Sequence, residues 1–287
     1  MDDDRSDAAG RLAAAGRTHV GHVRSGNEDA HLVRPDAGLL VVADGMGGHA
    51  AGEVASALAV EAIEERLTEG GWSGLRDARQ AVDEAIEAAN GSIHDDARRN
   101  PSRRGMGTTA TVLLFPDPRR WVAGQVGDSR AYLLRDGELS RLTTDHTVTP
   151  GSSTLTRALG THDSLEVDVL DAEARPGDLF LLCSDGLTDM LAHDDVRETL
   201  ADALGGTGLP AGGGAGSGGE GSSGAGGGGA GGVEGNGAVD GAAAAGEGPV
   251  SGRDLREAVE DAAAALVEAA LERGGRDNVT VVVAALA

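Results

Sequence analysis

Apolar residues recur with two different periods along the chain, and these periods predict which segments form helices and which form strands. Apolar positions at helical spacing, or Ala-rich runs, predict helices over residues 52–69, 75–98, 194–204 and 254–273. Short apolar runs between turn residues predict strands over residues 19–23, 39–43, 108–114, 121–126, 129–134, 138–142, 165–170, 179–183 and 279–285. Asp136-Gly137 predicts a tight hairpin turn between two of these strands.

The order of these elements predicts an α+β domain with antiparallel sheets. Residues 1–16 are polar and Ala-rich, and we expect them to form a disordered lead before a single domain over residues 17–287. The segment 205–252 holds 23 of the 47 glycines and lacks apolar periodicity, so it is expected to be a flexible surface insert in that domain. A neutral low-complexity insertion is favoured over a docking site.

The formal net charge of −23 changes the range of expected partners. Such a surface argues against nucleic acid or an anionic membrane as a partner. No apolar run approaches the roughly 20 residues that span a bilayer, and the acidic start of the chain lacks an apolar signal segment. We therefore expect a cytoplasmic protein. The single cysteine, Cys183, lies in an apolar run and is expected to be buried and structural.

Four aspartates share one local pattern, in which an apolar run adjoins an Asp beside a turn-forming residue. They are Asp44, Asp128, Asp185 and Asp277. The repetition predicts strands that deliver carboxylates to a common edge. Clustered carboxylates repel each other unless a cation lies between them, so the pattern favours a hard divalent metal with oxygen ligands.

Two of the local motifs can be interpreted in more than one way. Asp44 and the Gly45 carbonyl could ligate cations, and a Gly-rich strand-to-helix turn capped by Asp44 explains the same residues equally well. Arg24 precedes Glu28 and Asp29, and its guanidinium suits a phosphate dianion. The alternative is a surface Arg that pairs weakly with Glu28.

Seven short motifs follow one another between about residues 18 and 285. They are 24–30 (RSGNEDA), 42–49 (VADGMGGH), 105–109 (GMGTT), 127–130 (GDSR), 155–160 (LTRALG), 183–187 (CSDGL) and 277–280 (DNVT). Each motif alone is weak, but the ordered set resembles that of the metal-dependent Ser/Thr protein phosphatases, the PPM or protein phosphatase 2C family, in its bacterial branch.

The resemblance implies a four-layer α-β-β-α sandwich, with two central antiparallel sheets flanked by helices and a metal cleft at one end. It implies two Mn²⁺ or Mg²⁺ ions and a third, weaker one. The positions that match the family are Asp44 as the bridging ligand, Asp185 and Asp277 in the first metal site, the Gly45 carbonyl in the second with Glu28 and Asp29 nearby, Arg24 at the substrate phosphate, and Asp128 with Asp185 at the third metal.

The implied reaction is hydrolysis of phosphoserine and phosphothreonine in proteins by a metal-activated water, without a phosphoenzyme. Cys183 then has no nucleophilic role. Met46 stands where animal members carry a His that is assigned as general acid, so the general acid is left open, with His49 nearby. Two further departures are a short flap, residues 144–154, and the insert 205–252.

Two classes of function remain open at this point. Intact Arg24, Asp44, Asp185 and Asp277 favour an active phosphatase whose partners are phosphorylated Ser/Thr proteins, with a cognate bacterial Ser/Thr kinase acting on the same substrates. The short flap keeps a second class open, a catalytically weak or inactive regulatory module that binds phosphoproteins. Another two-metal hydrolase, such as a nuclease, is disfavoured because the sequence has no basic track.

Overall fold

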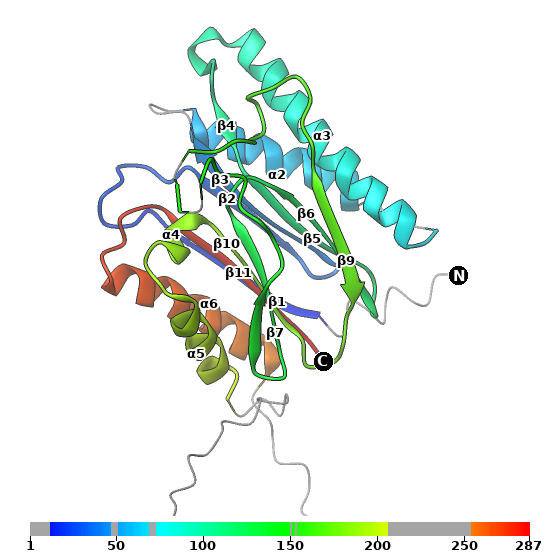
Figure 1. The fold of residues 1–287 in the computed structure, drawn as a ribbon, viewed down its shortest axis with the longest axis vertical. Coiled ribbons are helices and arrows are strands. Elements are labelled where there is room, and N and C mark those ends of the chain that lie inside the picture. Colours follow the sequence, from blue (N-terminus) through cyan, green and yellow to red (C-terminus); the bar gives the residue numbers. More distant parts are fainter. Residues whose placement is uncertain (1–11, 47–50, 69–72, 150, 153, 206–253) are drawn as a thin grey trace, which may run out of the picture.

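Two antiparallel sheets form the centre of the protein, and helices cover the outer face of each sheet (Figure 1). The computed structural model describes residues 12–46, 51–68, 73–149, 151–152, 154–205 and 254–287. The expected α+β sandwich of two antiparallel sheets flanked by helices is confirmed.

Each sheet has a simple order of neighbouring strands. The first sheet consists of β1 (Leu12–His19), β11 (Val279–Leu286), β10 (Leu179–Cys183), β7 (Arg130–Arg135) and β8 (Glu138–Arg141), in that order. The second sheet consists of β2 (Asp29–Arg34), β3 (Leu39–Met46), β5 (Ala110–Asp117), β6 (Arg120–Val126) and β9 (Asp168–Glu173), and the short β4 (Gly107–Thr108) pairs with β3.

The helices divide between the two sheets. The second sheet is covered by α2 (Gly52–Thr68) and α3 (Leu75–Arg99), and α3 leads into a short 3₁₀ turn, η1 (Pro101–Arg103). The first sheet is covered by α5 (His193–Ala203) and α6 (Leu255–Glu272), with the single-turn α4 (Asp185–Thr188) after β10. Asp254 caps α6, since its side chain accepts a hydrogen bond from the backbone N–H of Arg256.

Strand β10 shows why these strands are continuous apolar runs. Leu179, Leu181 and Cys183 pack under the helices of the first sheet. Phe180 and Leu182 alternate with them and pack between the two sheets. Because both faces of the strand are buried, no polar position interrupts the run, and the strand predicted over 179–183 has the observed bounds.

Three aromatic side chains pack together in the layer between the two sheets. The rings of Phe115 and Trp121, from the second sheet, meet the fully buried Phe180 edge-on, with centroids 5.2 and 6.0 Å from it. Such contacts add roughly 0.5–1.5 kcal/mol each to the burial term. The remaining apolar residues of this layer are aliphatic, as the small aromatic content of the chain requires.

The run of strands between residues 107 and 142 passes from one sheet to the other. Strands β5 and β6 form a hairpin in the second sheet, and β7 and β8 form a hairpin in the first. The β7–β8 turn is the predicted Asp136-Gly137 turn, and both residues have positive φ (53° and 79°), as a type I′ turn requires. The connection between β6 and β7 carries Asp128, so the change of sheet places this residue at one end of the sandwich.

The structure corrects several element boundaries. β1 begins at Leu12, although residues 1–16 were expected to be a lead and the first strand was expected over 19–23. Its residues pair in register with β11, from Leu12 opposite Leu286 to His19 opposite Val279, and this pairing extends the strand. β2 was not predicted, nor was α4, and β9 begins at Asp168 rather than near residue 165.

Some predictions lie outside the described residues. They concern residues 1–11, positions 47–49 of the Gly-rich motif, and the insert beyond Gly205. None of the helices in the described part of the chain combines the length and the hydropathy that crossing a membrane requires.

Candidate active site

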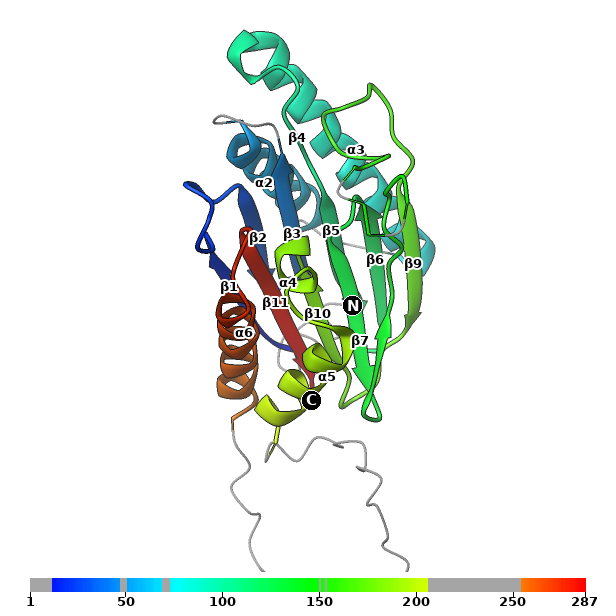
Figure 2. The ribbon, with the colours of Figure 1, turned by 60° about the vertical axis from the view of Figure 1, so that its left-hand side comes forward.

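The four aspartates that share a sequence pattern come from elements that meet at one end of the sandwich. Asp44 belongs to β3, Asp128 lies between β6 and β7, and Asp185 is the first residue of α4. Asp277 stands two residues before β11. Figures 1 and 2 show α4 beside the ends of β10 and β11.

Asp29 faces Asp44 across the β2–β3 ladder. Its Oδ2 accepts a hydrogen bond from Ser184 Oγ at 2.8 Å. Its Oδ1 is sealed from solvent and has no hydrogen-bond partner among the described residues. Burial raises the pKa of Asp29 to about 6. A buried carboxylate oxygen without a partner is costly, and this one is suited to a cation.

The backbone of Asp44 is fixed on both sides. Its N–H donates to Thr109 Oγ1, and its carbonyl accepts from Thr109 N–H and from Thr108 Oγ1, each at 2.9 Å. Burial, followed by the repulsion of Asp29 and Asp185, raises the pKa of Asp44 well above its ordinary value. The main chain of Asp44 is therefore fixed, and its carboxyl lies among other carboxylates that repel it.

Asp185 and Asp128 extend the same acidic group toward α4. Burial, followed by the repulsion of Asp128 and Asp189, raises the pKa of Asp185 to about 7. Burial, followed by the repulsion of Asp145, raises the pKa of Asp128. Asp189 was not predicted, although its position one helical turn after Asp185 was a usable signal. Asp145 accepts hydrogen bonds from Arg130, so its charge is already paired.

Gly45 lies where no other residue fits. The Gly45 N–H donates to the carbonyl of Glu28 at 3.1 Å. A Cβ at Gly45 would collide with the carbonyl oxygens of Glu28 and Gly52. The Glu28 carboxylate lies against Gly52 at the start of α2, where the helix dipole favours negative charge. Burial, followed by the repulsion of Glu53, raises the pKa of Glu28.

Arg24 lies at the exposed side of this group and forms an ion pair with Asp277. The distance between Arg24 Nη2 and Asp277 Oδ2 is 2.6 Å, and 55% of the Arg24 side chain is exposed. The other carboxylate oxygen of Asp277 accepts from the N–H of Asn278 at 2.8 Å. Arg24 therefore contacts a carboxylate of the predicted site rather than Glu28, the partner that the alternative interpretation named.

Asn278 is a site residue that the sequence reasoning missed. Its Oδ1 accepts from the Glu28 N–H at 2.8 Å, and its Nδ2 donates to the carbonyls of Val20 and Gly26, both at 2.9 Å. These three bonds connect both ends of the loop that carries Arg24. The side chain is buried, and its position beside Asp277 was the only signal in the sequence.

The donor set fits divalent cations by its chemistry. It consists of carboxylates and one backbone carbonyl, which are hard oxygen ligands, and its members repel each other without a positive charge between them. In the described part of the chain, no three His, Cys, Asp or Glu side chains are arranged as a ready-made metal site. The enclosed Asp29 Oδ1 and the raised pKa of Asp44 nevertheless fit a cation.

Comparison with known proteins identifies the family. The profile of the family described as protein phosphatase 2C matches residues 15–207. The chain belongs to this family. The serine/threonine protein phosphatase PstP of Mycobacterium tuberculosis is 41% identical over 206 residues, which are 66% of this chain and 39% of that protein. The serine/threonine phosphatase stp of Listeria monocytogenes is 34% identical over 207 residues, 64% of this chain and 81% of that protein.

Solved structures agree with this protein phosphatase 2C assignment. The M. tuberculosis PstP/Ppp structure covers 96% of this chain and 99% of its own, with a TM-score of 0.71 and 34% identity. The catalytic domain of PstP in complex with two manganese ions has a TM-score of 0.70 at 34% identity and covers 96% of this chain and 98% of its own. The chain matches bacterial members, and it spans only about two fifths of the length of full PstP.

The short flap of this protein phosphatase 2C domain is anchored by a buried histidine. Gly127 N–H donates to Nδ1 of His146 at 3.1 Å, and the His146 N–H donates to the Gly127 carbonyl at 2.9 Å. Nε2 therefore carries the proton and lies 3.1 Å from Asp168 Oδ2, while Arg157 Nη1 donates to Oδ1 of the same carboxylate. The flap thus holds the turn that carries Asp128. This link was missed because it joins residues far apart in the sequence.

Two residues near the site have limited roles. Burial raises the pKa of the Cys183 thiol to about 12, so this residue remains a neutral thiol near pH 7. Met46 pairs with Gly107 of β4 and offers no acid–base group. His49, the nearby alternative considered as general acid, lies outside the described residues.

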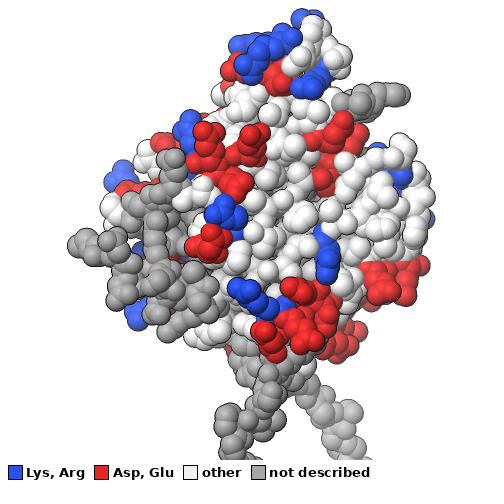
Figure 3. Space-filling view, turned by 180° about the vertical axis from the view of Figure 1, so that it is seen from behind, with Lys and Arg blue, Asp and Glu red and all other residues white. Residues whose placement is uncertain are grey.

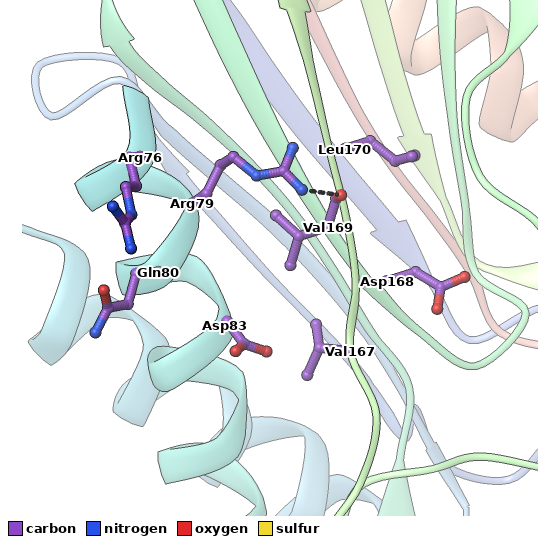
Figure 4. Close-up of a pocket in the computed structure, with 8 residues that line it drawn as sticks. All are labelled: Arg76, Arg79, Gln80, Asp83, Val167, Asp168, Val169 and Leu170. Carbon is purple, nitrogen blue, oxygen red and sulfur yellow. Dashed lines mark hydrogen bonds between the residues drawn. The ribbon is translucent and has the colours of Figure 1, made fainter. Parts of the chain in front are cut away.

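A hollow of about 620 Å³ lies away from the carboxylates, between α3 and the edge strand β9 (Figure 4). Arg79 points from α3 toward β9, where its Nη2 donates to the Val169 carbonyl at 2.8 Å and its Nη1 pairs with Asp171. The guanidinium thus covers part of the open edge of the second sheet. No residue of the predicted site lines this hollow.

Proposed function

We propose that this chain is an active protein-serine/threonine phosphatase that hydrolyses phosphoserine and phosphothreonine with two divalent cations, Mn²⁺ or Mg²⁺. The observation that carries the proposal is the enclosed, unpartnered Oδ1 of Asp29 opposite Asp44, within a group of carboxylates whose pKa values are raised. The two manganese ions of the PstP catalytic domain, a relative of the same fold, support it.

The proposed ligands are the residues that the motifs single out. Divalent cations at such a site supply Lewis-acid activation of water and neutralise charge on phosphoryl oxygens. Thr108 and Thr109 hold the main chain of Asp44, and Ser184 orients Asp29. The assignments are Asp44 as the bridging ligand, Asp185 and Asp277 at one cation, the Gly45 carbonyl at the other with Glu28 and Asp29 nearby, and Asp128 with Asp185 at a third, weaker site.

Arg24 is proposed to bind the substrate phosphate. Its side chain is exposed at the edge of the carboxylate group, and a guanidinium can make two parallel hydrogen bonds to a phosphate. Both oxygens of Asp277 are engaged, one by Arg24 and one by the Asn278 N–H. A cation held by Asp277 would compete with Arg24 for the negative charge of this carboxylate, and this would leave the guanidinium more available to a phosphate.

The substrates are proposed to be phosphorylated Ser/Thr proteins, which include those modified by a cognate bacterial Ser/Thr kinase. The names of the relatives support serine/threonine specificity. The buried thiol of Cys183 supports hydrolysis without a phosphoenzyme on that residue. A cytoplasmic location and the absence of nucleic-acid and membrane partners stay predictions from the sequence.

The test is hydrolysis of p-nitrophenyl phosphate and of a phosphothreonine peptide with Mn²⁺, with Mg²⁺ and with EDTA. We expect metal-dependent turnover that EDTA abolishes and that Asp44→Asn lowers by a factor of about 10³ or more, because removal of a group that stabilises charge in the transition state has effects of that order. Folding of the variant is checked by circular dichroism. Binding of the phosphopeptide without turnover in the wild type would instead favour the non-catalytic regulatory module.

A further inference from the structure

A cluster of arginines lies at the end of α3 in an otherwise acidic chain. Residues 98–104 read Arg-Arg-Asn-Pro-Ser-Arg-Arg, while the formal net charge of the chain is −23. Figure 3 shows blue side chains gathered at the top of the molecule, where α3 ends in Figure 1, and mostly red groups on the rest of that face. Positive charge is therefore concentrated at one place on the surface, the end of α3.

The four arginines differ in how they are paired. Arg103 Nη1 contacts the carboxylate of Asp96 at 2.9 Å, and this pair fixes the turn after α3. Arg98 approaches Asp95 and Asp163 only at 3.9 and 3.8 Å, with 72% of its side chain exposed. Arg99 and Arg104 are exposed, and neither has an ion pair among the described residues. Three guanidinium groups are thus open to a ligand.

Helix stability accounts for only part of this cluster. Cations in the last turn of a helix interact favourably with its dipole, which explains Arg98 and Arg99. Arg104 lies beyond α3, as the C-cap of the three-residue turn η1, so the dipole of α3 does not account for it. Its charge therefore has no structural partner in the described part of the chain.

The cluster lies close to the proposed active site along the chain. Arg104 precedes Gly107 by three residues, and three residues span at most about 11 Å. Gly107 pairs with Met46, and Thr108 Oγ1 donates to the carbonyl of Asp44 at 2.9 Å. The cluster therefore joins the carboxylate group through a short stretch of chain, and an extended peptide with its phosphate at the carboxylates reaches roughly 10–17 Å from it over three to five residues.

We propose that Arg98, Arg99 and Arg104 form a docking surface for acidic residues that flank the phosphorylated residue of a protein substrate. The inference rests on the proposed phosphatase function and names its substrate class, phosphoproteins with an acidic segment near the phosphorylated residue. Charge complementarity favours an acidic occupant, because this surface is positive while the net charge of the chain is negative. Close attraction at this surface offsets the long-range repulsion of acidic substrates, which salt screens beyond about 10 Å.

The test compares phosphothreonine peptides that carry three acidic residues on one side of the phosphothreonine with matched peptides that carry Gln there. The variants are Arg98→Gln/Arg99→Gln/Arg104→Gln and a control, Arg66→Gln/Arg119→Gln/Arg256→Gln. The control arginines are exposed, lie on α2, the β5–β6 turn and α6, and have no ion pairs among the described residues. Both variants change the net charge equally, so only the position of the charge differs.

We expect the wild type to favour the acidic peptides, and the α3 variant to lose that preference through a rise in KM. The loss should be roughly three- to tenfold in kcat/KM, since exposed ion pairs are individually weak. Hydrolysis of p-nitrophenyl phosphate, which has no flanking residues, should be unchanged. The control variant should keep the preference, and added salt should reduce it in the wild type.

Fluorescence anisotropy of the labelled peptides in EDTA measures the same preference without turnover. It therefore still tests the docking surface if p-nitrophenyl phosphate is not hydrolysed, a result that would count against the proposed phosphatase function alone. Equal binding of acidic and neutral peptides by the wild type would overturn the docking surface. An equal loss in both variants would also overturn it. Analytical ultracentrifugation covers a different occupant: an oligomer that dissociates only in the α3 variant would assign the cluster to a contact between copies of the chain.

Discussion

Asn278 holds the loop that carries Arg24, because its side chain bonds to the Glu28 N–H and to the carbonyls of Val20 and Gly26. Asp44, Asp185 and Asp277 were predicted because a carboxylate beside a buried strand is visible in a local pattern. The role of Asn278 depends on partners about 250 residues away along the chain, and no local pattern contains them. His146 was missed for the same reason, because its partners become neighbours only when the two sheets assemble.

Asn278→Ala should weaken both the fold and the binding of phosphate. Three hydrogen bonds of a buried side chain are lost, so the free energy of unfolding should fall by about 2–4 kcal/mol. The loop that carries Arg24 loses its attachment, so KM for a phosphopeptide should rise more than kcat falls. Urea unfolding and steady-state kinetics measure the two effects.

Asn90→Ala provides the matched control, because Asn90 is equally buried and holds a different loop through Gly160 and His162. It should cost similar stability with a smaller effect on KM. Equal effects of the two variants on KM would show that Asn278 supports the fold without positioning Arg24.

Elements were predicted where their burial was uniform and missed where it depended on a neighbour. β10 and β11 are apolar on both faces, so their positions were evident in the sequence. β2 is half-buried along its length and contains His31 and Arg34, which leaves no apolar run. The Ala-rich start of β1 has low strand propensity and gains its structure by pairing with the valine-rich β11.

The layer between the sheets should depend strongly on Phe180 of β10. Phe180→Ala should lower the free energy of unfolding by about 3–5 kcal/mol, since the side chain is fully buried between the sheets. Phe180→Leu retains most of the volume and should cost about 1 kcal/mol. Guanidinium unfolding measures both variants. A loss below about 1 kcal/mol for the alanine variant would contradict tight packing of this layer.

The whole molecule combines an acidic surface with a buried group of carboxylates, and this combination should make its metal-free stability depend on pH. Asp29 and Asp185 have pKa values of about 6 and about 7, above the ordinary value near 4, mainly through burial. Between about pH 4 and 7 the folded chain holds protons that the unfolded chain releases. Metal-free stability should therefore fall as the pH rises through this range.

Thermal unfolding in EDTA at pH 5, 6, 7 and 8 measures this dependence. The Tm should decrease toward pH 8, and Mn²⁺ should restore it there by binding the folded chain. Asp29→Asn removes one of the two carboxyls, so the slope of Tm against pH should be smaller than in the wild type. An unchanged slope in this variant would assign the dependence to the acidic surface instead of the buried group.

Calorimetric titration of Mn²⁺ into EDTA-stripped, desalted protein measures whether the carboxylates around Asp44 hold two divalent cations. We expect two tight sites per chain, loss of tight binding in Asp44→Asn, and unchanged binding in Arg119→Gln, which changes only an exposed arginine in the β5–β6 turn. Absence of tight binding in the wild type, or the same binding in Asp44→Asn, would show that these carboxylates do not form a two-cation site.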